Sequence, residues 1–493
     1  MSRAERSLSE LGLRAQGGRE ARIGGLAVDS RKVTRGDLFA ALPGSAMHGA
    51  EFIPYALRMG AAAILTDRQG AEIAREALAA ADAALVIAEN PRQALAFAAA
   101  LWFGRQPDCV VAVTGTSGKT SVATFTRQIW QALGLSACNL GTMGVLGDFT
   151  APLAHTTPEP VTLHRLLREM ADEGITHLAM EASSHGLDQS RLDGVRLRAA
   201  AFTNLSQDHL DYHPDMESYF AAKLRLFTQL LPEDGTAVVN VDERHGRDVA
   251  QAARDRGLRV LTIGRDPAAD LVIAAQRFDA TGQDLRFTHG GRPHMVRLAL
   301  IGGFQAENAL AAAALAMASG EEPEAVIASL PDLVTVRGRM ELAARRDNGA
   351  AVFVDYSHKP GALAAALRSL RPHVMGRIVV VFGAGGDRDR GKRPMMGQVA
   401  AELADVVIVT DDNPRSEDPA RIRAEVMQGC PGATEVADRA EAILRGVDAL
   451  QPGDALLIAG KGHETGQIVG HDVYPFDDAE QASVAVAALE GRI

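Results

Sequence analysis

The chain has 493 residues, of which 47% are hydrophobic and 23% charged, and its formal net charge is -11. This length exceeds what one hydrophobic core can organise, so we expect a soluble protein of three domains. The acidic balance, without any basic run, argues against a nucleic-acid partner. Three widely spaced cysteines, Cys109, Cys138 and Cys430, predict neither a disulfide framework nor a zinc site, and indicate a reducing compartment.

The amino-terminal residues 1–10 are charged and lack the apolar core of a signal peptide. The longest apolar stretch of this region, 94–103, is too short to cross a bilayer. We therefore expect a cytoplasmic protein without membrane insertion.

Residues 1–104 predict a small α/β domain, with strands at 61–66 and 83–88 and a helix opened by Pro91. Two polar turns within it, 29–31 and 43–49, offer side chains and backbone N–H groups that suit a small polar ligand. Taken alone, such stretches are more often ordinary turns than ligand sites.

The stretch 109–121 predicts a phosphate-binding loop at the start of a second domain, 105–335. A β-branched strand leads into a Gly-rich turn, and a helix follows at 122–133. Gly115 and Gly118 let the backbone N–H groups face an anion, Lys119 reaches the outer phosphates, and Thr120 can ligate Mg²⁺. Val113 stands where the strict motif has its first glycine. We predict ATP or GTP binding.

Two polar segments of this domain are candidates for contacts around the phosphates. Thr156 and Thr157 can donate hydroxyls to an anion, or can cap the helix that follows. Glu181 ends an apolar run, as does the Mg²⁺-binding carboxylate of nucleotide hydrolases, although a lone strand-end Glu is usually solvated. Hydrogen-bonding side chains then crowd one short span: Ser183, Ser184, His185, Gln189 and Arg191.

His209, flanked by Asp208 and Asp211, lies in a loop dense in groups that bind metals and favours a second cation site. In the helix predicted at 218–231, Lys223 falls within the apolar stripe, whereas Arg225 points away from it. A lysine in that position snorkels, pairs with an acid or loses its charge. A neutral lysine could be carbamylated by CO₂ and would then become a carboxylate-like Mg²⁺ ligand.

Strands at 236–241 and 258–263 and alternating strands over 270–300 precede a helix at 302–313. That helix carries Asn308, which could hydrogen-bond an adenine edge or could be solvated.

The last domain, 336–493, is again α/β, with strands predicted at 351–355, 378–382, 406–410 and 455–459. Each strand ends in a polar loop, and loops at the carboxyl ends of parallel strands form the ligand crevice of an open α/β sheet. Arg388 and Arg415 can each grip a carboxylate, and Glu464 can receive an ammonium group. Two carboxylate-binding arginines together with an ammonium-binding glutamate predict an amino-acid site.

Several stretches together resemble the Mur ligase family across essentially the whole chain. They are 29–31, 115–121, 156–158, 181–185, 204–213, Lys223, 338–339, 355–358, 385–388, 412–415 and 460–464. The resemblance implies an α/β protein of three domains. A central P-loop ATPase-like domain with a mostly parallel sheet would be flanked by a small N-terminal α/β domain that binds a UDP-sugar and by a C-terminal Rossmann-like domain that binds an amino acid.

The resemblance also implies an ATP-dependent amide ligase of peptidoglycan synthesis. ATP would phosphorylate the D-glutamyl carboxylate of UDP-N-acetylmuramoyl-L-alanyl-D-glutamate, and the amine of meso-diaminopimelate would attack the acyl phosphate, with Mg²⁺ as cofactor. Within the family, a lysine-adding member is the alternative. Lysine-adding relatives usually lack the arginine at 415, and a desolvated Arg415 left unpaired would penalise lysine. We expect a monomer whose partners are these small molecules.

Site residues carry over from the family as follows. Lys119, Lys223, Glu181 and His209 would be catalytic, and Thr120, Glu181, His209 and carbamylated Lys223 would hold metal ions. ATP would be bound by Gly115, Thr116, Ser117, Gly118, Lys119, Thr120, Ser121, Asn308, Arg339, Asp355 and His358. The UDP-muramoyl dipeptide would be bound by Val28, Ser30, Ser45, Ala46, Met47, Thr156, Thr157, Ser183, Gln189 and Arg191. Diaminopimelate would be bound by Arg388, Asp412, Asn413, Pro414, Arg415, Gly460 and Glu464.

One residue departs from the family pattern: Lys359 stands where a small polar residue is expected, within the loop proposed to contact ADP. The rival functions are a folylpolyglutamate synthase, a P-loop kinase or GTPase, and a non-catalytic UDP-sugar-binding protein. A folylpolyglutamate synthase would not need the uridine-site-like domain. A P-loop kinase or GTPase would not use the set of Arg388, Arg415 and Glu464. A non-catalytic UDP-sugar-binding protein would not explain Lys119 and Glu181.

Overall fold

The structure is a computed structural model that describes residues 5–44, 47–209 and 212–493. Its contacts divide the chain into two compact units. The first unit comprises Met1–Leu271 and Leu310–Ile327, and the second comprises Val272–Ala309 and Ala328–Ile493. Each unit is described by itself. The domain boundaries expected at 104/105 and 335/336 stay predictions.

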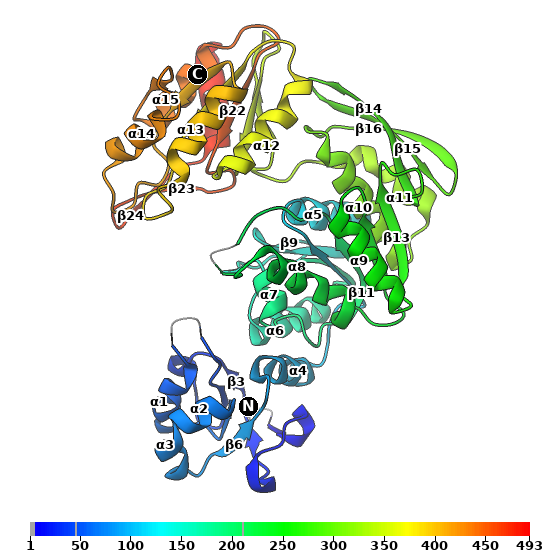
Figure 1. Cartoon of the computed structure of the whole chain (residues 1–493), viewed down its shortest axis with the longest axis vertical. Helices are drawn as coiled ribbons and strands as arrows, with labels where there is room; N and C mark the ends of the chain where they lie inside the picture. The colour runs from blue at the N-terminus through cyan, green and yellow to red at the C-terminus, as the bar shows by residue number, and fades with distance from the viewer. Residues whose placement is uncertain (1–4, 45–46, 210–211) are drawn as a thin grey trace. The chain divides into compact units, whose positions relative to one another are not determined.

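The amino-terminal part of the first unit is built on a parallel sheet of order β3-β4-β5-β6 (Figure 1). Its elements are β1 (Arg6–Ser7), β2 (Arg22–Ile23), β3 (Leu26–Ala27), β4 (Leu38–Ala40), α1 (Ile53–Arg58), β5 (Ala63–Thr66), α2 (Arg68–Ile73), α3 (Arg75–Ala79), β6 (Ala84–Ile87) and α4 (Pro91–Phe103), with short 3-10 helices between them. Pro91 occupies the first turn of α4, where no backbone donor is needed, and Asn90 caps the helix by accepting the backbone N–H of Gln93. The strands and the helix predicted in this region are confirmed.

The rest of the first unit carries a mostly parallel sheet of order β13-β12-β11-β7-β10-β8-β9. Its elements are β7 (Cys109–Thr114), α5 (Lys119–Ala132), β8 (Ala137–Gly141), β9 (Gly144–Gly147), α6 (Pro160–Asp172), β10 (His177–Glu181), α7 (Ser184–Asp188), β11 (Leu197–Phe202), α8 (Met216–Arg225), β12 (Thr236–Asn240), α9 (Arg244–Asp255) and β13 (Arg259–Gly264). Strand β7 is buried along its whole length and pairs in parallel with β10 and β11. The ends of β7 and β10 therefore meet at one edge, where the phosphate loop lies.

The helix predicted at 218–231 differs from the observed one. Helix α8 ends at Arg225, and a π-helical turn covers Leu226–Leu230. Such turns occur mostly as local bulges within α-helices and are frequent near functional sites. Hydrophobic periodicity alone does not distinguish a π turn from a continued α-helix.

The second unit contains an antiparallel meander of β14 (Leu271–Asp279), β15 (Gly282–His289) and β16 (Arg292–Leu298), the last two paired from Gln283 with Leu298 to His289 with Arg292. Its second sheet has the order β17-β18-β22-β19-β20-β21, parallel except for β17. Its elements are β17 (Glu341–Arg345), β18 (Ala351–Asp355), α12 (Pro360–Leu370), β19 (Ile378–Phe382), α13 (Lys392–Leu403), β20 (Val406–Val409), α14 (Pro419–Met427), β21 (Thr434–Glu435), α15 (Arg439–Asp448), β22 (Ala455–Ala459), β23 (Gly466–Val469), β24 (Asp472–Pro475) and α16 (Asp478–Leu489). Helices α10 (Phe304–Ser319) and α11 (Pro323–Ser329) contain the residues at which the two units divide.

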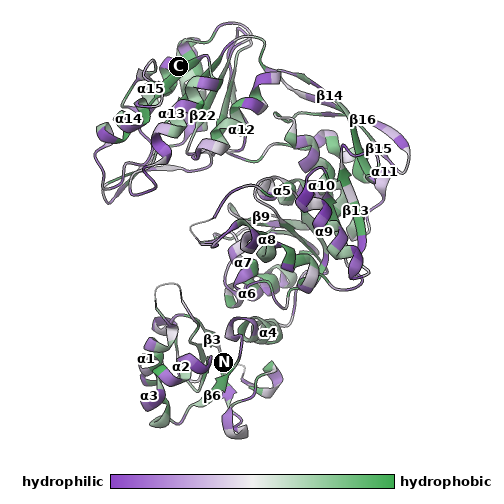
Figure 2. Ribbon diagram, viewed as in Figure 1, coloured by the Kyte–Doolittle hydropathy of each residue, from purple (hydrophilic) through white to green (hydrophobic). Residues whose placement is uncertain are grey.

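Both faces of the second sheet are buried. One face packs with α12, α13 and α14 in a cluster that includes Phe353 and Phe382, and the other packs with α15 and α16 in a cluster that includes Val381 and Ile458. Figure 2 shows hydrophobic residues along β22, as expected for a parallel strand covered on both sides. The strands predicted at 351–355, 378–382 and 455–459 match the observed strands residue for residue.

Candidate functional site

The phosphate loop joins β7 to α5, as predicted. Gly115 has a φ of +145°, and a Cβ there would lie 1.9 Å from Oγ1 of Thr203, so only glycine fits. Gly118 also has a positive φ, +86°, and directly precedes Lys119, the first residue of α5. Lys119 Nζ donates to the carbonyls of Gly115 and Thr116, both at 2.9 Å. The loop thus presents the amino end of a helix together with a lysine, the arrangement that binds phosphate.

The loop that follows β11 supports the phosphate loop from behind. The backbone N–H of Thr116 donates to the carbonyl of Asn204, and that of Ser117 donates to Asn204 Oδ1, each at 2.9 Å. Thr203 Oγ1 donates to the carbonyl of Ser117 at 2.6 Å. The backbone of the loop is therefore held in place by residues about 90 positions later in the sequence, a contact that local sequence patterns do not reveal.

Glu181, at the end of β10, is only 1% exposed, so the alternative of a solvated strand-end carboxylate is wrong. Its Oε1 accepts from Thr120 Oγ1 at 3.0 Å and from the backbone N–H of Thr142 at 2.9 Å. A Cβ on Gly141 would lie 2.0 Å from this same oxygen. The carboxylate is thus fixed against the phosphate-loop threonine, and Mg²⁺ binding by this pair stays a prediction. Sequence analysis missed Thr142, although a threonine directly after a buried strand is a visible signal.

The two threonines predicted to meet an anion lie beside Glu181 and do not cap helix α6. Thr157 Oγ1 donates to the carbonyl of Glu181 at 2.9 Å, and Thr156 Oγ1 lies 3.1 Å from Thr142 Oγ1. Helix α6 is capped by Glu159, whose carboxylate accepts the backbone N–H groups of residues 161 and 162. The capping alternative for the threonines is therefore wrong.

The other polar residues of this span form one hydrogen-bonded group. Ser183 Oγ donates to Thr157 Oγ1 at 3.1 Å and caps helix α7. Arg191 donates to the carbonyl of Thr157 at 2.6 Å and, through Nη2, to Gln189 Oε1 at 2.8 Å. Burial lowers the pKa of Arg191 from its ordinary value. The structure thus brings together Thr156, Thr157, Ser183, Gln189 and Arg191, and their contacts to a muramoyl dipeptide stay a prediction.

Lys223 is buried beneath the phosphate loop. Its side chain is 1% exposed, and Nζ donates at 2.8 Å to the carbonyl of Gly115, the same oxygen that accepts from Lys119. Nζ also lies 4.4 Å from the centroid of the Tyr219 ring. Burial, reinforced by the charge of Lys119, holds the pKa of the Lys223 amine well below its ordinary value. The snorkelling alternative is wrong, because the amine does not reach solvent.

Arg225 lies two residues after Lys223 and turns to the opposite side of α8. Its Nη2 lies 2.7 Å from Oδ1 of Asp193, a carboxylate that also accepts from Gln93 of helix α4 at 2.8 Å. The expectation that Arg225 points away from the apolar stripe holds, but the side chain is only 14% exposed and forms an ion pair.

His209 lies in a cluster of rings. It has a left-handed backbone, with a φ of +55°, and its ring centroid lies 5.1 Å from that of His185. His213 and Tyr219 lie next to it, 5.2 Å apart. Within 5–44, 47–209 and 212–493, no group of three or more His, Cys, Asp and Glu side chains is arranged to hold a metal ion. Metal binding by His209 stays a prediction.

The polar turn at residues 29–31 is stabilised by its own side chains. Ser30 is 9% exposed and opens a 3-10 helix that Asp29 caps. The Arg31 guanidinium holds the pKa of Asp29 at about 2. Val28 is half-buried and Met47 is 56% exposed, while Ser45 and Ala46 fall outside the described residues. Uridine binding here stays a prediction, with an ordinary turn as the open alternative.

In the second unit, the predicted amino-acid site lies at the carboxyl ends of β18, β19, β20 and β22. Arg415 has a φ of +51°, and its backbone N–H donates to the carbonyl of Ile468 at 3.0 Å. Its guanidinium donates to the carbonyl of Gly386 at 2.9 Å, and the side chain is half-buried. Arg388 is exposed and donates only to the adjacent carbonyl of Asp387 among the described residues, at 3.1 Å. Both guanidiniums retain donors for a carboxylate.

The loops after β20 and β22 are joined by side chains of the same set. Asn413 Nδ2 donates to Glu464 Oε2 at 2.8 Å. A Cβ on Gly460, whose φ is +120°, would lie 2.5 Å from Oδ2 of Asp412. Asp412, Asn413 and Pro414 are all buried. Arg388, Asp412, Asn413, Pro414, Arg415, Gly460 and Glu464 thus lie on three neighbouring loops, and diaminopimelate binding by them stays a prediction.

Four residues predicted to contact ATP belong to the second unit. Asn308 is 6% exposed and donates to Gln305 Oε1 at 3.0 Å, so the solvated alternative for it is wrong. Arg339 lies over the ring of Tyr356, 4.9 Å from its centroid. Burial raises the pKa of Asp355 and lowers that of His358. Lys359 is exposed and precedes helix α12. The nucleotide contacts of Asn308, Arg339, Asp355 and His358 stay predictions.

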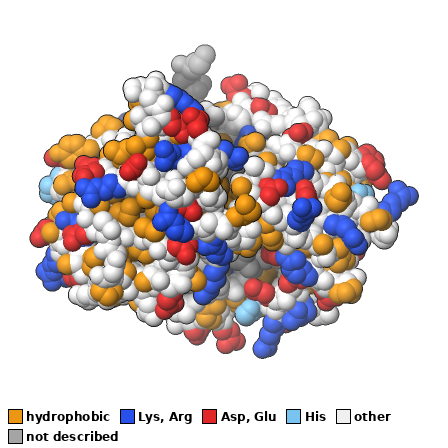
Figure 3. All heavy atoms as spheres, turned by 90° about the horizontal axis from the view of Figure 1, so that it is seen from above, with side chains coloured by type: hydrophobic (Ala, Val, Ile, Leu, Met, Phe, Trp, Pro, Cys, Tyr) orange, Lys and Arg blue, Asp and Glu red, His pale blue; other side chains and the backbone are white. Residues whose placement is uncertain are grey.

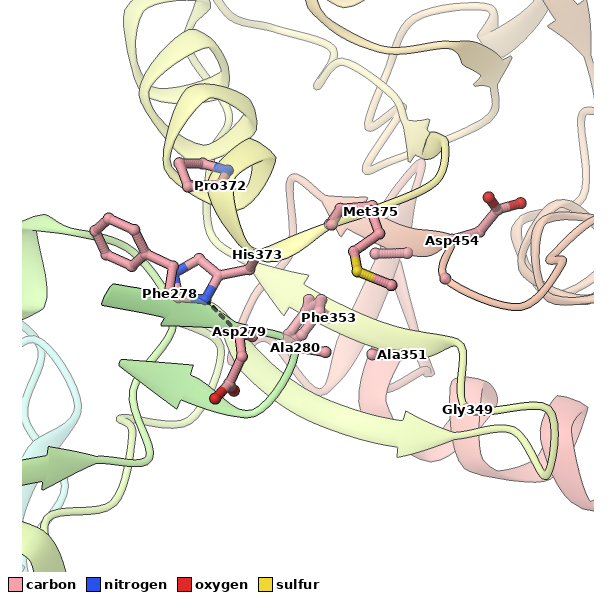
Figure 4. A pocket seen from close by; sticks show the side chains of 13 residues that line it. Phe278, Asp279, Ala280, Gly349, Ala351, Phe353, Pro372, His373, Met375 and Asp454 are labelled. Carbon is pink, nitrogen blue, oxygen red and sulfur yellow. Dashed lines mark hydrogen bonds between the residues drawn. The ribbon is translucent and has the colours of Figure 1, made fainter. Parts of the chain in front are cut away.

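A cavity of about 320 Å³ lies at the other end of the second sheet (Figure 4). Its lining includes Ala351 and Ala455, the first residues of β18 and β22, together with Phe278, Phe353 and His373. His373 Nδ1 lies 2.7 Å from the carbonyl of Asp279, the contact drawn in Figure 4. Ligands of open α/β sheets bind at the carboxyl ends of the strands, so this cavity at the amino ends is not the predicted site.

On the face of the described residues that Figure 3 draws, basic and acidic side chains are interspersed. No helix within the described part of the chain is long and apolar enough to span a membrane.

Three models of the Mur ligase family match the chain. The family's catalytic domain matches residues 22–102, its middle domain matches 113–316, and its glutamate ligase domain matches 338–462. A UDP-N-acetylmuramoyl-L-alanyl-D-glutamate--2,6-diaminopimelate ligase of Bradyrhizobium diazoefficiens is 52% identical over 472 residues, which are 94% of this chain and 95% of the relative.

Solved structures of Mur ligases are similar to this chain over nearly its whole length. A structure of a UDP-N-acetylmuramoyl-L-alanyl-D-glutamate--2,6-diaminopimelate ligase is similar at a TM-score of 0.74 and 33% identity, and covers 99% of this chain and 100% of its own. The MurF ligase of Thermotoga maritima, solved in complex with ADP, reaches a TM-score of 0.63 at 19% identity, covers 98% of this chain and 99% of its own, and shows the shared fold alone. The predicted α/β fold of the family is confirmed.

Proposed function

The chain belongs to the Mur ligase family, and from this premise we propose that it is an ATP-dependent ligase that adds meso-2,6-diaminopimelate to UDP-N-acetylmuramoyl-L-alanyl-D-glutamate. The observation that carries the proposal is the convergence of Lys119 and Lys223 on the carbonyl of Gly115, in a phosphate loop whose Thr120 donates to the buried Glu181. A phosphate cradle of this kind suits phosphoryl transfer, in which positioning and charge stabilisation supply most of the catalysis.

Different groups of the phosphate loop would contact the phosphates of the nucleotide. The backbone N–H groups at the start of α5 and the Lys119 ammonium would bind the phosphates and withdraw charge from the transferring phosphoryl group. The glutamyl carboxylate of the precursor would attack the γ-phosphorus of ATP, which forms an acyl phosphate and releases ADP. The amine of diaminopimelate would then attack the acyl carbon and expel inorganic phosphate as the amide forms.

The donor set at Glu181 fits Mg²⁺. A buried carboxylate lies 3.0 Å from the hydroxyl of Thr120, and oxygen ligands of these two kinds are what Mg²⁺ prefers. When bound, Mg²⁺ supplies positive charge to the phosphate oxygens. Thr120 and Glu181 would hold it, and His209 would contribute to a second cation site.

The environment of Lys223 fits a carbamate. Burial holds the pKa of its amine well below the ordinary value, which favours the neutral form that reacts with CO₂. Carbamylation would replace a cation that is repelled by Lys119 with an anion that Lys119 attracts. It would also provide a carboxylate-like ligand next to the phosphate loop.

The second unit would bind diaminopimelate through opposite charges. Arg388 and Arg415 would each pair with a carboxylate, and Glu464 would receive an ammonium group. Lysine lacks one of these carboxylates and would leave an arginine unpaired, which supports diaminopimelate over the lysine-adding alternative.

The acyl-phosphate route is tested by isotope labelling of the carboxylate oxygens of the precursor. The precursor is prepared with ¹⁸O in both oxygens of the D-glutamyl carboxylate to which the amino acid is joined, and turned over with ATP and meso-diaminopimelate. Because the attacking carboxylate oxygen becomes the bridge of the acyl phosphate, we expect one ¹⁸O in each inorganic phosphate, measured by mass spectrometry. Unlabelled phosphate with a normal yield of the amide would overturn the acyl-phosphate route.

A further inference from the structure

Lys461 is a buried cation that the proposed function leaves without a role. It follows β22, between Gly460 and Gly462, and its side chain is 0% exposed. A buried lysine is rare unless oxygen atoms surround its ammonium group. Sequence analysis passed over it, although a lysine between two glycines directly after a buried strand is a readable signal.

The ammonium group of Lys461 meets three oxygen atoms. Nζ donates to the carbonyl of Gly466 at 2.6 Å and to Asn413 Oδ1 at 3.1 Å, and it lies 3.5 Å from Glu464 Oε2. An ammonium group has three donors and no acceptor, so these contacts use all of its capacity. Lys461 therefore has no donor left for a substrate and acts only through the groups that it holds.

Lys461 determines which way the Asn413 amide faces. Asn413 Oδ1 accepts from Lys461 and from the backbone N–H of Ile468, at 2.9 Å. A flipped amide would place its own N–H₂ group against these two donors, so Nδ2 must face the other way. There it donates to Glu464 Oε2 at 2.8 Å.

Glu464 is consequently held by one of its two oxygens. Oε2 contacts Asn413 and Lys461, whereas no described residue forms a hydrogen bond with Oε1. The Glu464 side chain is 34% exposed, so the carboxylate can reach a ligand. An acceptor that is fixed through one oxygen and open at the other suits an incoming ammonium group.

The same lysine also supports the predicted carboxylate contact. Gly466, whose carbonyl it binds, is the first residue of β23, and β23 pairs with Arg415 through the carbonyl of Ile468. Arg415 in turn accepts at its carbonyl from the N–H of Gly470 at 2.7 Å. One buried ammonium group thus joins the segments that carry Arg415, Asn413 and Glu464.

We propose that Lys461 is a positioning residue for amino-acid recognition, which orients Asn413 and Glu464 so that Glu464 Oε1 receives the ammonium group of the incoming amino acid. This inference rests on the proposed function. A lysine that served stability alone would not change the affinity for one substrate selectively.

The test compares steady-state kinetics of the full chain for Lys461→Met, Glu464→Gln and the double variant. We expect Lys461→Met to raise the KM for diaminopimelate about tenfold or more, the effect of losing a charged hydrogen bond, with little change in the KM for ATP. The double variant should be no worse than the more affected single variant, because both changes remove the same contact. If Lys461→Met does not fold, Lys461→Gln, which retains donors, takes its place.

Arg377→Met is the matched control. Arg377 pairs at 2.7 Å with Asp454, a 3% exposed carboxylate before the opposite end of β22. Its loss should lower the melting temperature and leave the KM for diaminopimelate unchanged.

The outcomes separate the two proposals. Glu464→Gln without any effect on the KM for diaminopimelate would contradict the proposed amino-acid site. If Glu464→Gln raises the KM for diaminopimelate and Lys461→Met does not, only the positioning role of Lys461 is overturned. The same holds if the effects of the two changes add in the double variant, or if Lys461→Met raises the KM for every substrate equally.

Discussion

Replacing Lys223 by alanine should lower kcat by about 100-fold or more, because it removes the group that we propose to become a carbamate next to the phosphate loop. Lys223 is buried and donates to the carbonyl of Gly115, so alanine at this position leaves no amine there to form the carbamate. The measurement is the rate of phosphate release with all three substrates. A short carboxylate such as formate or acetate should restore part of the rate, since it can occupy the space of the carbamate.

Arg225→Ala is the control for this experiment. Arg225 lies on the same helix, and its loss breaks an ion pair with Asp193 without touching the phosphate loop. It should lower stability, and added carboxylates should have no effect on it. Full activity of Lys223→Ala, or the same rescue in both variants, would contradict the carbamate.

Replacing Arg415 by alanine should raise the KM for diaminopimelate about 100-fold, because the substrate carboxylate would be buried without its charged partner. The KM for ATP should change little. The preference for diaminopimelate over lysine should shrink, since lysine does not use this contact. Competition between the two amino acids at fixed ATP measures the change.

Arg421→Ala is the matched control, because Arg421 is 65% exposed and pairs with Glu425 on helix α14. Surface ion pairs of this kind contribute about 0–1 kcal/mol to the free energy of unfolding. The KM for diaminopimelate and the KM for ATP should therefore stay near those of the parent chain. Equal effects of Arg415→Ala on both KM values would remove Arg415 from the amino-acid site.

The sequence predicted those features that depend on neighbouring residues. Strands of continuous apolar residues were located to within a residue or two, because burial on both faces leaves an unbroken apolar run. The apolar stripe placed Lys223 on the packed face of its helix, but it left open whether the amine would reach solvent, pair with an acid or lose its charge.

Two kinds of feature were missed, namely local details that the sequence pattern does not distinguish and contacts with residues far along the chain. Helix α6 is capped by Glu159 and by neither of the two threonines before it, because the capping residue is set by where the chain turns into the helix. Thr142 gains its partner Glu181 from strand β10, and Lys461 gains its partner Asn413 from the loop after β20. The π turn after Arg225 leaves no mark in the hydrophobic period.

The central claim is tested most directly by phosphate release from ATP with UDP-N-acetylmuramoyl-L-alanyl-D-glutamate, comparing meso-diaminopimelate with L-lysine. We expect release with diaminopimelate and almost none with lysine. Release with lysine would keep the ligase and contradict the role of Arg415. Release with neither amino acid would contradict the ligase itself.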